Sequence, residues 1–409
     1  MVTTYYPPYN FGGDGIFVQR LAHALAEHGH TVDVIHCVDA YRLTAGQEPA
    51  RTYEHHSNIT VHGLRSSFGR LSPLATQQTG HPYFKTAALR RVLDRQFDVI
   101  HYHNISLVGG PKVLMYGRGI KLYTMHEYWL ICPTHVLFKF NREVCHQPQC
   151  VRCTLSYGRP PQLWRASNLL KTAIQQVDAF LALSQSSLKR HQQAGFAGRL
   201  IHCPGFVPPV EVYNEKTFPT PKPQPYFLVV GRLEKLKGIQ TLIPLFHSNS
   251  KARLLIAGTG KYEPELRRLA AGNPRIQFLG YVSGTALYAL YRHAHAVLVP
   301  SLCPEIFPLV ILEAFQQQTP VIARALGGMS ELIHESAGGL LYETNAELLS
   351  ALELLHENET YRRTLGEQGY QAYLQQWTVE THLQRYFTLI DEIVAARRQS
   401  GCGTGAMRN

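Results

Sequence analysis

Short β-rich runs alternate regularly with segments of helical period along the 409 residues, and both halves of the chain show this pattern. Alternation of this kind predicts parallel sheets covered by helices on both faces, hence an α/β fold. Apolar residues recur at helical spacing over residues 18–25, 84–93, 264–271, 285–292 and 379–397. The predicted strands are residues 31–36, 59–63, 97–103, 121–125 and 179–182, then 226–230, 253–257, 276–278, 296–299, 320–323 and 339–342.

A proline-rich stretch separates the two halves, with seven prolines in residues 204–225. Proline at that density blocks both helix and sheet, so this stretch is expected to be a linker. The sequence therefore predicts a first domain over residues 1–205, a linker over 206–225, a second domain over 226–375, and a helix with a tail over 376–409. That helix is free to pack back on the first domain. The first strand has only Val2, Thr3 and Thr4, so either it is short or the true start lies upstream.

Composition excludes several classes of protein. With 45% hydrophobic and 17% charged residues, the chain is not disordered. No apolar run approaches the ~18–20 residues of a membrane span, and the N-terminus lacks the pattern of a signal peptide. Eight cysteines are too few for a disulfide framework, so we expect reduced thiols in a cytoplasmic protein.

The excess of positive charge lies almost entirely in the first half. Residues 1–205 contain 21 Lys and Arg against 11 Asp and Glu, whereas residues 206–409 contain 19 against 18. This asymmetry predicts an anionic partner: an acceptor that carries phosphate, or an anionic membrane surface contacted from the inner face of the plasma membrane. A solvated basic face is the alternative, and no nucleic acid is expected as a partner.

The strongest motif of the second half begins where strand 226–230 ends. Gly231 lets the backbone approach a ligand closely, and Arg232 and Lys237 follow where a diphosphate could lie. A helix is expected after Gly238, and its N-terminus would add oriented N–H groups.

Glu305 and Glu313 lie eight residues apart in Pro-Glu-x-Phe-Pro-Leu-Val-x-Leu-Glu-Ala. On one helix their backbones would be ~12 Å apart, too far for the facing carboxyl pair of a glycosidase. Pro308 instead predicts a loop, with a helix from about Leu309. Two separate grips on an extended ligand fit better, because each carboxylate can accept bonds from vicinal hydroxyls. The loop residues expected to face phosphates between them are Phe307, Pro308, Leu309 and Val310.

These motifs resemble the donor site of the retaining GT-B glycosyltransferases of family 4. The resemblance extends to the segments 257–260, 278–282 and 327–331, in the family's order. It implies two Rossmann-like parallel-sheet domains facing a central cleft. It also implies metal-independent transfer of a hexose, with retained configuration, from a UDP- or GDP-linked sugar to the hydroxyl of a sugar or lipid-linked acceptor. Cell-surface polysaccharide, lipopolysaccharide and glycolipid synthesis all remain open.

The resemblance also implies roles for individual residues. Arg232 and Lys237 would stabilise the leaving diphosphate, Glu305 would hold sugar hydroxyls, and Glu313 would hold the ribose. The backbone around Val282 would contact the nucleobase. From the first domain, the glycine loop with Gly12 and Gly13 would face the diphosphate, and His126 at the end of strand 121–125 would contact the donor sugar. His101, His103 and Asn104 end another strand, where the family often has a polar acceptor-side loop.

Half of the cysteines fall within 22 residues, in the spacing C-x12-C-x4-C-x2-C. They are Cys132, Cys145, Cys150 and Cys153. Four thiolates would form a closed structural zinc site, although zinc sites more often contain two Cys-x-x-Cys pairs. Four reduced thiols in a loop are the alternative. Catalysis itself is expected to need no cofactor.

Rival functions leave different signatures. A nucleotide-sugar epimerase would turn over the donor without an acceptor, and a catalytically inactive protein would bind it without turnover. A phosphorylase would need a cofactor-lysine motif that the sequence lacks. A dinucleotide oxidoreductase would need G-x-G-x-x-G, but Gly13-x-Gly15 continues with Ile16, Phe17 and Val18.

Overall fold

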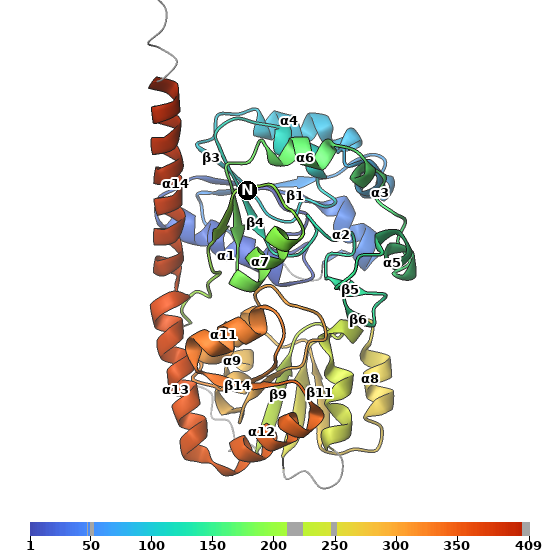
Figure 1. Cartoon of the computed structure of the whole chain (residues 1–409), viewed down its shortest axis with the longest axis vertical. Coiled ribbons are helices and arrows are strands. Elements are labelled where there is room, and N and C mark those ends of the chain that lie inside the picture. Colours follow the sequence, from blue (N-terminus) through green and yellow to red (C-terminus); the bar gives the residue numbers. More distant parts are fainter. Residues whose placement is uncertain (47, 50–52, 211–223, 247–251, 403–409) are drawn as a thin grey trace, which may run out of the picture.

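The computed structural model describes residues 1–46, 48–49, 53–210, 224–246 and 252–402. Two α/β units are stacked along the long axis, and the last two helices run beside both of them (Figure 1). Most of the predicted linker lies in residues 211–223, outside the described residues.

The first unit is a parallel sheet covered by helices. Its pairs β1–β2 and β3–β4–β7–β8 are all parallel. The elements are α1 (Gly13–Glu27), β1 (Val32–Cys37), α2 (Val38–Ala45), β2 (Ile59–Leu64), α3 (Leu71–Thr79), η1 (Tyr83–Lys85), α4 (Thr86–Leu93), β3 (Val99–Tyr102), η2 (Pro111–Met115), β4 (Ile120–Met125), β5 (Phe138–Lys139), β6 (Glu143–Val144), α5 (Cys150–Ser156), η3 (Leu163–Ala166), α6 (Leu169–Ile174), β7 (Ala179–Ala182), α7 (Gln185–Gln193) and β8 (Leu200–His202).

The second unit repeats this arrangement. Its six parallel strands have the order β11-β10-β9-β12-β13-β14. The elements are β9 (Tyr226–Val230), η4 (Lys235–Lys237), η5 (Ile239–Thr241), η6 (Ile243–Phe246), β10 (Arg253–Ala257), α8 (Glu263–Leu269), β11 (Ile276–Gly280), α9 (Thr285–His293), β12 (Val297–Val299), α10 (Leu309–Gln316), β13 (Val321–Arg324), α11 (Gly328–Ser336), β14 (Gly339–Tyr342), α12 (Asn345–Glu357), α13 (Glu359–Gln376) and α14 (Val379–Cys402).

All eleven predicted strands after the first are confirmed, most within two residues at either end. The expected first strand forms no regular strand. Val2 instead makes single parallel bridges to Ile35 of β1 and to Tyr102 of β3, so the N-terminal segment fills the gap between these strands. Only four residues precede the Tyr5–Pro8 turn, which explains why the pairing goes no further.

The prediction of a helix after Gly238 is wrong. Within the described part of this segment the chain forms only the two short 3-10 helices η5 and η6. Pro244 lies inside the segment, and its ring and missing N–H are incompatible with a helix interior.

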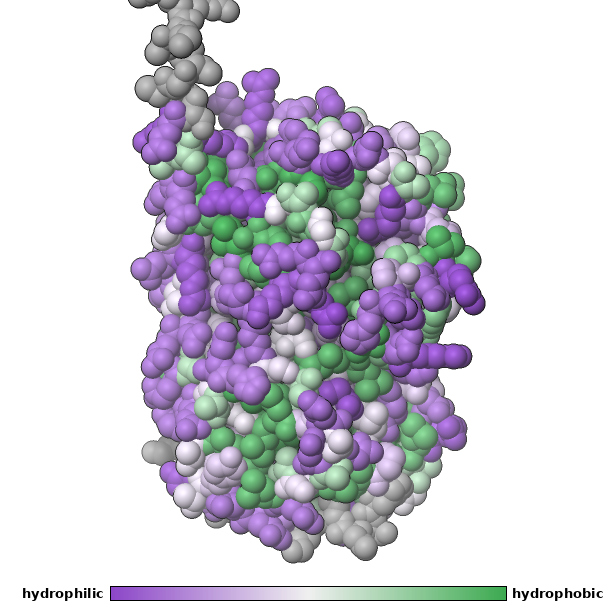
Figure 2. Space-filling view, in the orientation of Figure 1, coloured by the Kyte–Doolittle hydropathy of each residue, from purple (hydrophilic) through white to green (hydrophobic). Residues whose placement is uncertain are grey.

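The C-terminal helix α14 packs on the first unit. Leu383, Tyr386 and Ile393 belong to the same buried cluster as Phe17 and Leu21 of α1. Its outer side is hydrophilic along the edge of the molecule (Figure 2). Among the described residues, no helix combines the length and apolarity needed to cross a bilayer.

Candidate active site

Glu305 lies in the loop after β12 and is anchored by two side chains. Lys237 Nζ donates to its Oε1 at 2.8 Å, and the Ser301 hydroxyl donates to the same oxygen. Burial alone would raise the pKa of Glu305, but the charge of Lys237, its hydrogen bond and that of Ser301 bring the pKa below its ordinary 4.5. Glu305 is therefore a carboxylate at neutral pH.

Two glycines fix the backbone that carries this pair. Gly238 has φ of 75°, and a Cβ there would lie 1.9 Å from the carbonyl oxygen of Pro300. Gly328 donates its N–H to the Glu305 carbonyl, and a Cβ there would lie 2.0 Å from the Ile306 oxygen. Any other residue would push the Lys237 turn or the Glu305 loop away from its neighbour.

Arg232 and the glycine loop of the first unit face one another. A Cβ on Gly12 would lie 3.8 Å from Arg232 Nε, and one on Gly13 would lie 3.4 Å from Leu309 Cδ1. The exposed Arg232 guanidinium donates to Glu234 at 2.8 Å. The predicted residues from the two halves of the chain thus meet at the ends of their sheets.

Glu313 on α10 carries an interdomain ion pair that the sequence did not reveal. Arg20 on α1 donates to its Oε1 at 2.9 Å, and the Tyr291 hydroxyl donates to its Oε2 at 3.0 Å. Burial and the Glu313 charge raise the pKa of Tyr291 well above its ordinary value, so this hydroxyl remains a donor. Each carboxylate oxygen retains one further lone pair for a ligand hydroxyl.

The loop from Phe307 to Val310 leads directly into α10. Pro308 is the N-cap, and its carbonyl accepts the Ile311 N–H at 3.0 Å, so the N–H groups of Leu309 and Val310 are the ones without a partner within the helix. The Phe307 ring lies against Gly205, where a Cβ would be 2.8 Å away. Val282, after β11, is half-buried and packs on the same apolar cluster as Leu309.

His126 meets a second histidine rather than standing alone. His103 Nδ1 and His126 Nε2 are 3.0 Å apart, and the His126 ring contacts Phe17 edge-on, with ring centroids 5.0 Å apart. Burial lowers the pKa of His126 to about 4, although Asp14 opposes the shift. His126 is therefore neutral at physiological pH. One ring nitrogen of the pair donates and the other accepts.

A second interdomain contact lies at the start of α7. The backbone N–H groups of Gln185 and Ser186 donate to the two carboxylate oxygens of Glu331 on α11, at 2.6 and 2.8 Å. A carboxylate at a helix N-terminus satisfies otherwise unpaired donors. Sequence patterns signal the helix cap but not its partner, 146 residues away.

The four clustered cysteines line one small cavity of about 20 Å³. Cys132 follows β4, Cys145 follows β6, and Cys150 and Cys153 lie on α5. Burial and the neighbouring thiols raise the pKa of Cys145 and of Cys150. All four are free thiols. Within the described residues, no group of three or more His, Cys, Asp or Glu side chains is arranged to hold a metal ion, so zinc stays a prediction.

Two family models match the chain. The model described as Glycosyltransferase Family 4 matches residues 11–209, and the one described as Glycosyl transferases group 1 matches residues 213–372. An uncharacterized glycosyltransferase of Methanocaldococcus jannaschii is 26% identical over 386 residues, 86% of this chain and 86% of the relative. A D-inositol 3-phosphate glycosyltransferase of an Arthrobacter species is 26% identical over 416 residues, 95% of this chain and 92% of the relative.

Solved structures share the fold over almost the whole chain. Sucrose-phosphate synthase from Thermosynechococcus elongatus has a TM-score of 0.74 at 21% identity, covering 97% of this chain and 98% of its own. Anabaena HepE in complex with UDP and glucose has a TM-score of 0.64 at 18% identity, covering 95% and 99%. These structures therefore share the fold over nearly the whole length of the chain.

Proposed function

Because the chain belongs to the family 4 glycosyltransferases of the GT-B fold, we propose that it transfers a hexose from a nucleoside diphosphate sugar to an acceptor hydroxyl with retained configuration. The observation that carries the proposal is the pairing of Lys237 with the largely buried Glu305. The charge of Arg232 also acts on Glu305, and Arg232 faces Gly12 of the first domain. Two cations next to a glycine loop suit a diphosphate, and an anchored carboxylate suits sugar hydroxyls.

The donor would lie along the edge of the second sheet. Glu313 would accept the ribose hydroxyls, and the free N–H groups at the start of α10 would face the diphosphate. Glu305 would hold hydroxyls of the hexose. HepE has been solved with UDP-glucose, so UDP-linked sugars are the first donors to test, with GDP-linked sugars second.

In the proposed reaction one bond breaks, one bond forms and one proton is transferred. The bond between the anomeric carbon and the diphosphate oxygen breaks, and its electron pair leaves with the nucleoside diphosphate. The acceptor oxygen bonds to the same face of that carbon, and its proton passes to a diphosphate oxygen. Arg232 and Lys237 would stabilise the charge that develops on the leaving group, so this step needs no metal.

His126 would act on the sugar rather than on the proton. With a pKa of about 4 it is neutral at pH 7, so it can hydrogen-bond a hydroxyl but adds no charge. His103 Nδ1 lies 3.0 Å from His126 Nε2, and this hydrogen bond fixes the orientation of the His126 ring. The neutral ring would therefore position the hexose near the acceptor without a general-acid role.

The test is turnover of UDP-glucose and related donors, with water or simple sugars as acceptor. We expect release of the nucleoside diphosphate, and proton NMR should detect the α-anomer as the first sugar product from an α-linked donor. The Lys237→Met variant should release the nucleoside diphosphate at least about 100-fold more slowly than the wild type. A β-anomer first product would contradict retention, and a change in the sugar of the intact nucleotide would identify an epimerase.

A further inference from the structure

Asp14 is a half-buried carboxylate that takes no part in the donor contacts described above. It lies in the first turn of α1, directly after the glycine loop. The helix begins without a side-chain cap, so the Asp14 carboxylate does not serve as one. In the part of the chain that the structure describes, its one hydrogen bond comes from Asn104, and no cation forms an ion pair with it.

Two neighbours fix the direction of this carboxylate. Asn104 Nδ2 donates to Asp14 Oδ2 at 3.2 Å. Asn104 is itself buried, and its Oδ1 accepts from both the N–H and the hydroxyl of Ser106, at 3.2 and 2.7 Å. Because the amide oxygen must face these two donors, the amide nitrogen must face Asp14. One carboxylate oxygen is thus held, and within the described residues Oδ1 has no donor.

Asp14 Oδ1 lies on the side of α1 that faces the reacting centre. A Cβ on Gly12 would lie 3.5 Å from this oxygen and 3.8 Å from Arg232 Nε, so both groups approach the same point of the glycine loop. Phe17 lies three residues further along the same face of α1, and its ring contacts His126 edge-on. Asp14 therefore lies near both the residue proposed to stabilise the diphosphate and the residue proposed to contact the hexose.

The chemistry of a carboxylate narrows what it can bind here. An ionised carboxylate only accepts hydrogen bonds and repels a diphosphate, so its partner should be a hydroxyl. The proposed grip on the donor hexose is Glu305, which belongs to the second domain. Asp14 belongs to the first domain, so the hydroxyl that it can reach is best assigned to the acceptor.

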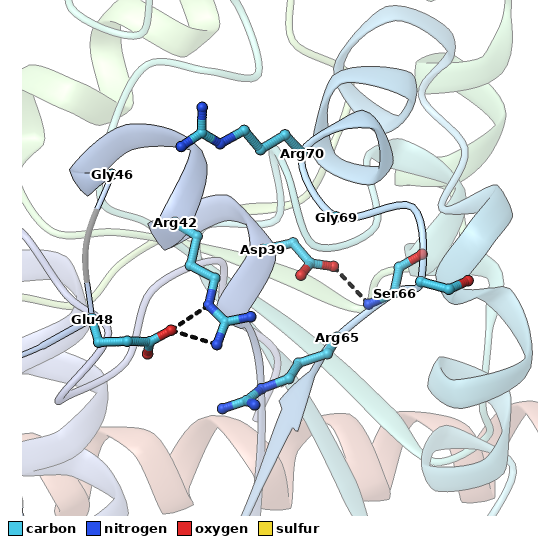
Figure 3. Close-up of a pocket in the computed structure, with 9 residues that line it drawn as sticks. Asp39, Arg42, Gly46, Glu48, Arg65, Ser66, Gly69 and Arg70 are labelled. Carbon is cyan, nitrogen blue, oxygen red and sulfur yellow. Dashed lines mark hydrogen bonds and ion pairs between the residues drawn. The ribbon is translucent and has the colours of Figure 1, made fainter.

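The arginines of a larger cavity in the first domain do not form a comparable site. This cavity, of about 590 Å³, lies between α2 and the segment after β2. Figure 3 shows the guanidinium groups of Arg65 and Arg70 on opposite sides of Arg42 and Asp39, so they do not converge on one ligand. Arg42 is also paired with Glu48, its Nε lying 2.6 Å from Oε1.

We propose that Asp14 Oδ1 binds the acceptor by accepting a hydrogen bond from the hydroxyl next to the one that reacts. The acceptor is then a sugar ring or another polyol with neighbouring hydroxyls at its reacting end. Asn104, held by Ser106, is the positioning residue for this carboxylate. The inference rests on the proposed function, because it names the molecule that receives the hexose. The reacting hydroxyl still passes its proton to the diphosphate oxygen, so Asp14 forms no bond and takes up no proton.

The experiment compares two fates of the donor hexose in one sample: transfer to an added polyol and transfer to water. The donor is the one that the wild type turns over, the polyols are glycerol and a methyl glucoside, and NMR measures the ratio of glycoside to free hexose. The variant is Asp14→Asn. Its amide oxygen must accept from Asn104, so an NH₂ group replaces the charged acceptor on the side of the cleft. Glu27→Gln, exposed at the other end of α1, is the matched control.

We expect glycoside from the wild type and from Glu27→Gln. Asp14→Asn should lower the ratio of glycoside to free hexose at least about tenfold, because a hydrogen bond to a charged group is lost. The KM for the polyol should rise. Asn104→Leu should raise this KM by a smaller factor, since Asp14 is still present but no longer held. The rise in Tm with UDP, measured for each variant, reports that the chain is folded and the donor site intact.

Three results would overturn the inference. An equal ratio for Asp14→Asn and the wild type would remove Asp14 from the site. Hydrolysis lowered as strongly as transfer would assign Asp14 to the donor hexose instead. A wild type that hydrolyses the donor but glycosylates neither polyol would contradict the acceptor class. A folded wild type that turns over no donor at all would instead overturn the proposed function, and this inference with it.

Discussion

Arg20 of the first domain and Glu313 of the second form an ion pair of 2.9 Å across the interface, and both side chains are more than four-fifths buried. Tyr291 holds the other carboxylate oxygen. The residue proposed to bind the donor ribose is therefore also a link between the domains. If Glu313 binds the donor ribose as proposed, one carboxylate would serve both the nucleotide and the contact between the domains.

Replacing Arg20 by methionine should destabilise the chain while preserving the carboxylate. Loss of a hydrogen bond between charged, largely buried groups costs about 1–3 kcal/mol. Urea unfolding should show this as a lower midpoint. Tyr291→Phe removes the other contact of Glu313 within its own domain and serves as the comparison. Equal stability of Arg20→Met and wild type would show that the pair adds nothing across the interface.

The Lys237→Met substitution should lower the free energy of unfolding by an amount that depends on pH. In the wild type the pKa of Glu305 is lowered below 4.5, so the stability gained from this carboxylate is present above about pH 4.5 and is lost as the pH falls through the folded-state pKa. In the variant, burial remains but the cation is gone, so the pKa should rise.

The stability difference between wild type and Lys237→Met should therefore be largest at neutral pH. It should shrink as the pH falls from the raised Glu305 pKa of the variant toward the lowered Glu305 pKa of the wild type. Urea midpoints from pH 3.5 to 7.5 measure it. The double variant Lys237→Met with Glu305→Gln is the control, because it contains no buried charge to strand. A difference that is independent of pH would contradict the account of this pair.

His126 should make the chain sensitive to mild acid. Its folded pKa is about 4 against 6.5 in the unfolded chain, so the unfolded state binds the extra proton between these values. Stability is then complete above pH 6.5 and falls as the pH drops toward 4, by up to about 1.4 kcal/mol per pH unit. His126→Gln keeps a polar partner for His103. It should reduce the slope of stability against pH between pH 4 and 6.5 by the contribution of about one bound proton. An unchanged slope would show that His126 is not the titrating group.

The cysteine cavity makes a prediction about metal content. If the four thiols bind zinc, the purified protein should contain about one zinc per chain, and a chelator should lower its Tm. Cys150→Ser with Cys153→Ser should abolish both effects. Cys203→Ala should retain them, because Cys203 does not line the cavity. Metal-free protein with reduced thiols would leave the cluster as four unligated cysteines, and two disulfides would assign it a redox role.

Most of the fold could be predicted because buried parallel strands appear as short apolar runs, as in β9 and β10. The failure after Gly238 came from the Lys-Gly pattern, which suggests a helix start, whereas Pro244 prevents one. The bounds of the first strand were hard to predict because Val2 pairs with neighbours on both sides through one residue only.

The sequence predicted most residues of the site but not the contacts between them. Local motifs located Lys237, Glu305 and Glu313, but Arg20 is 293 residues from its partner and belongs to no motif. The His103–His126 pair had a usable signal, because both residues end strands that prove to be parallel neighbours.

Glu313 and the adjacent loop are proposed to hold a nucleoside diphosphate. The shift in Tm with UDP, GDP and ADP, measured for wild type, Glu313→Ala and Arg20→Met, tests this assignment. A nucleotide at 100 times its Kd should add about 2.7 kcal/mol of apparent stability. We predict that one nucleotide stabilises the wild type and Arg20→Met but not Glu313→Ala. No shift with any of the three in folded wild-type protein would contradict the claim.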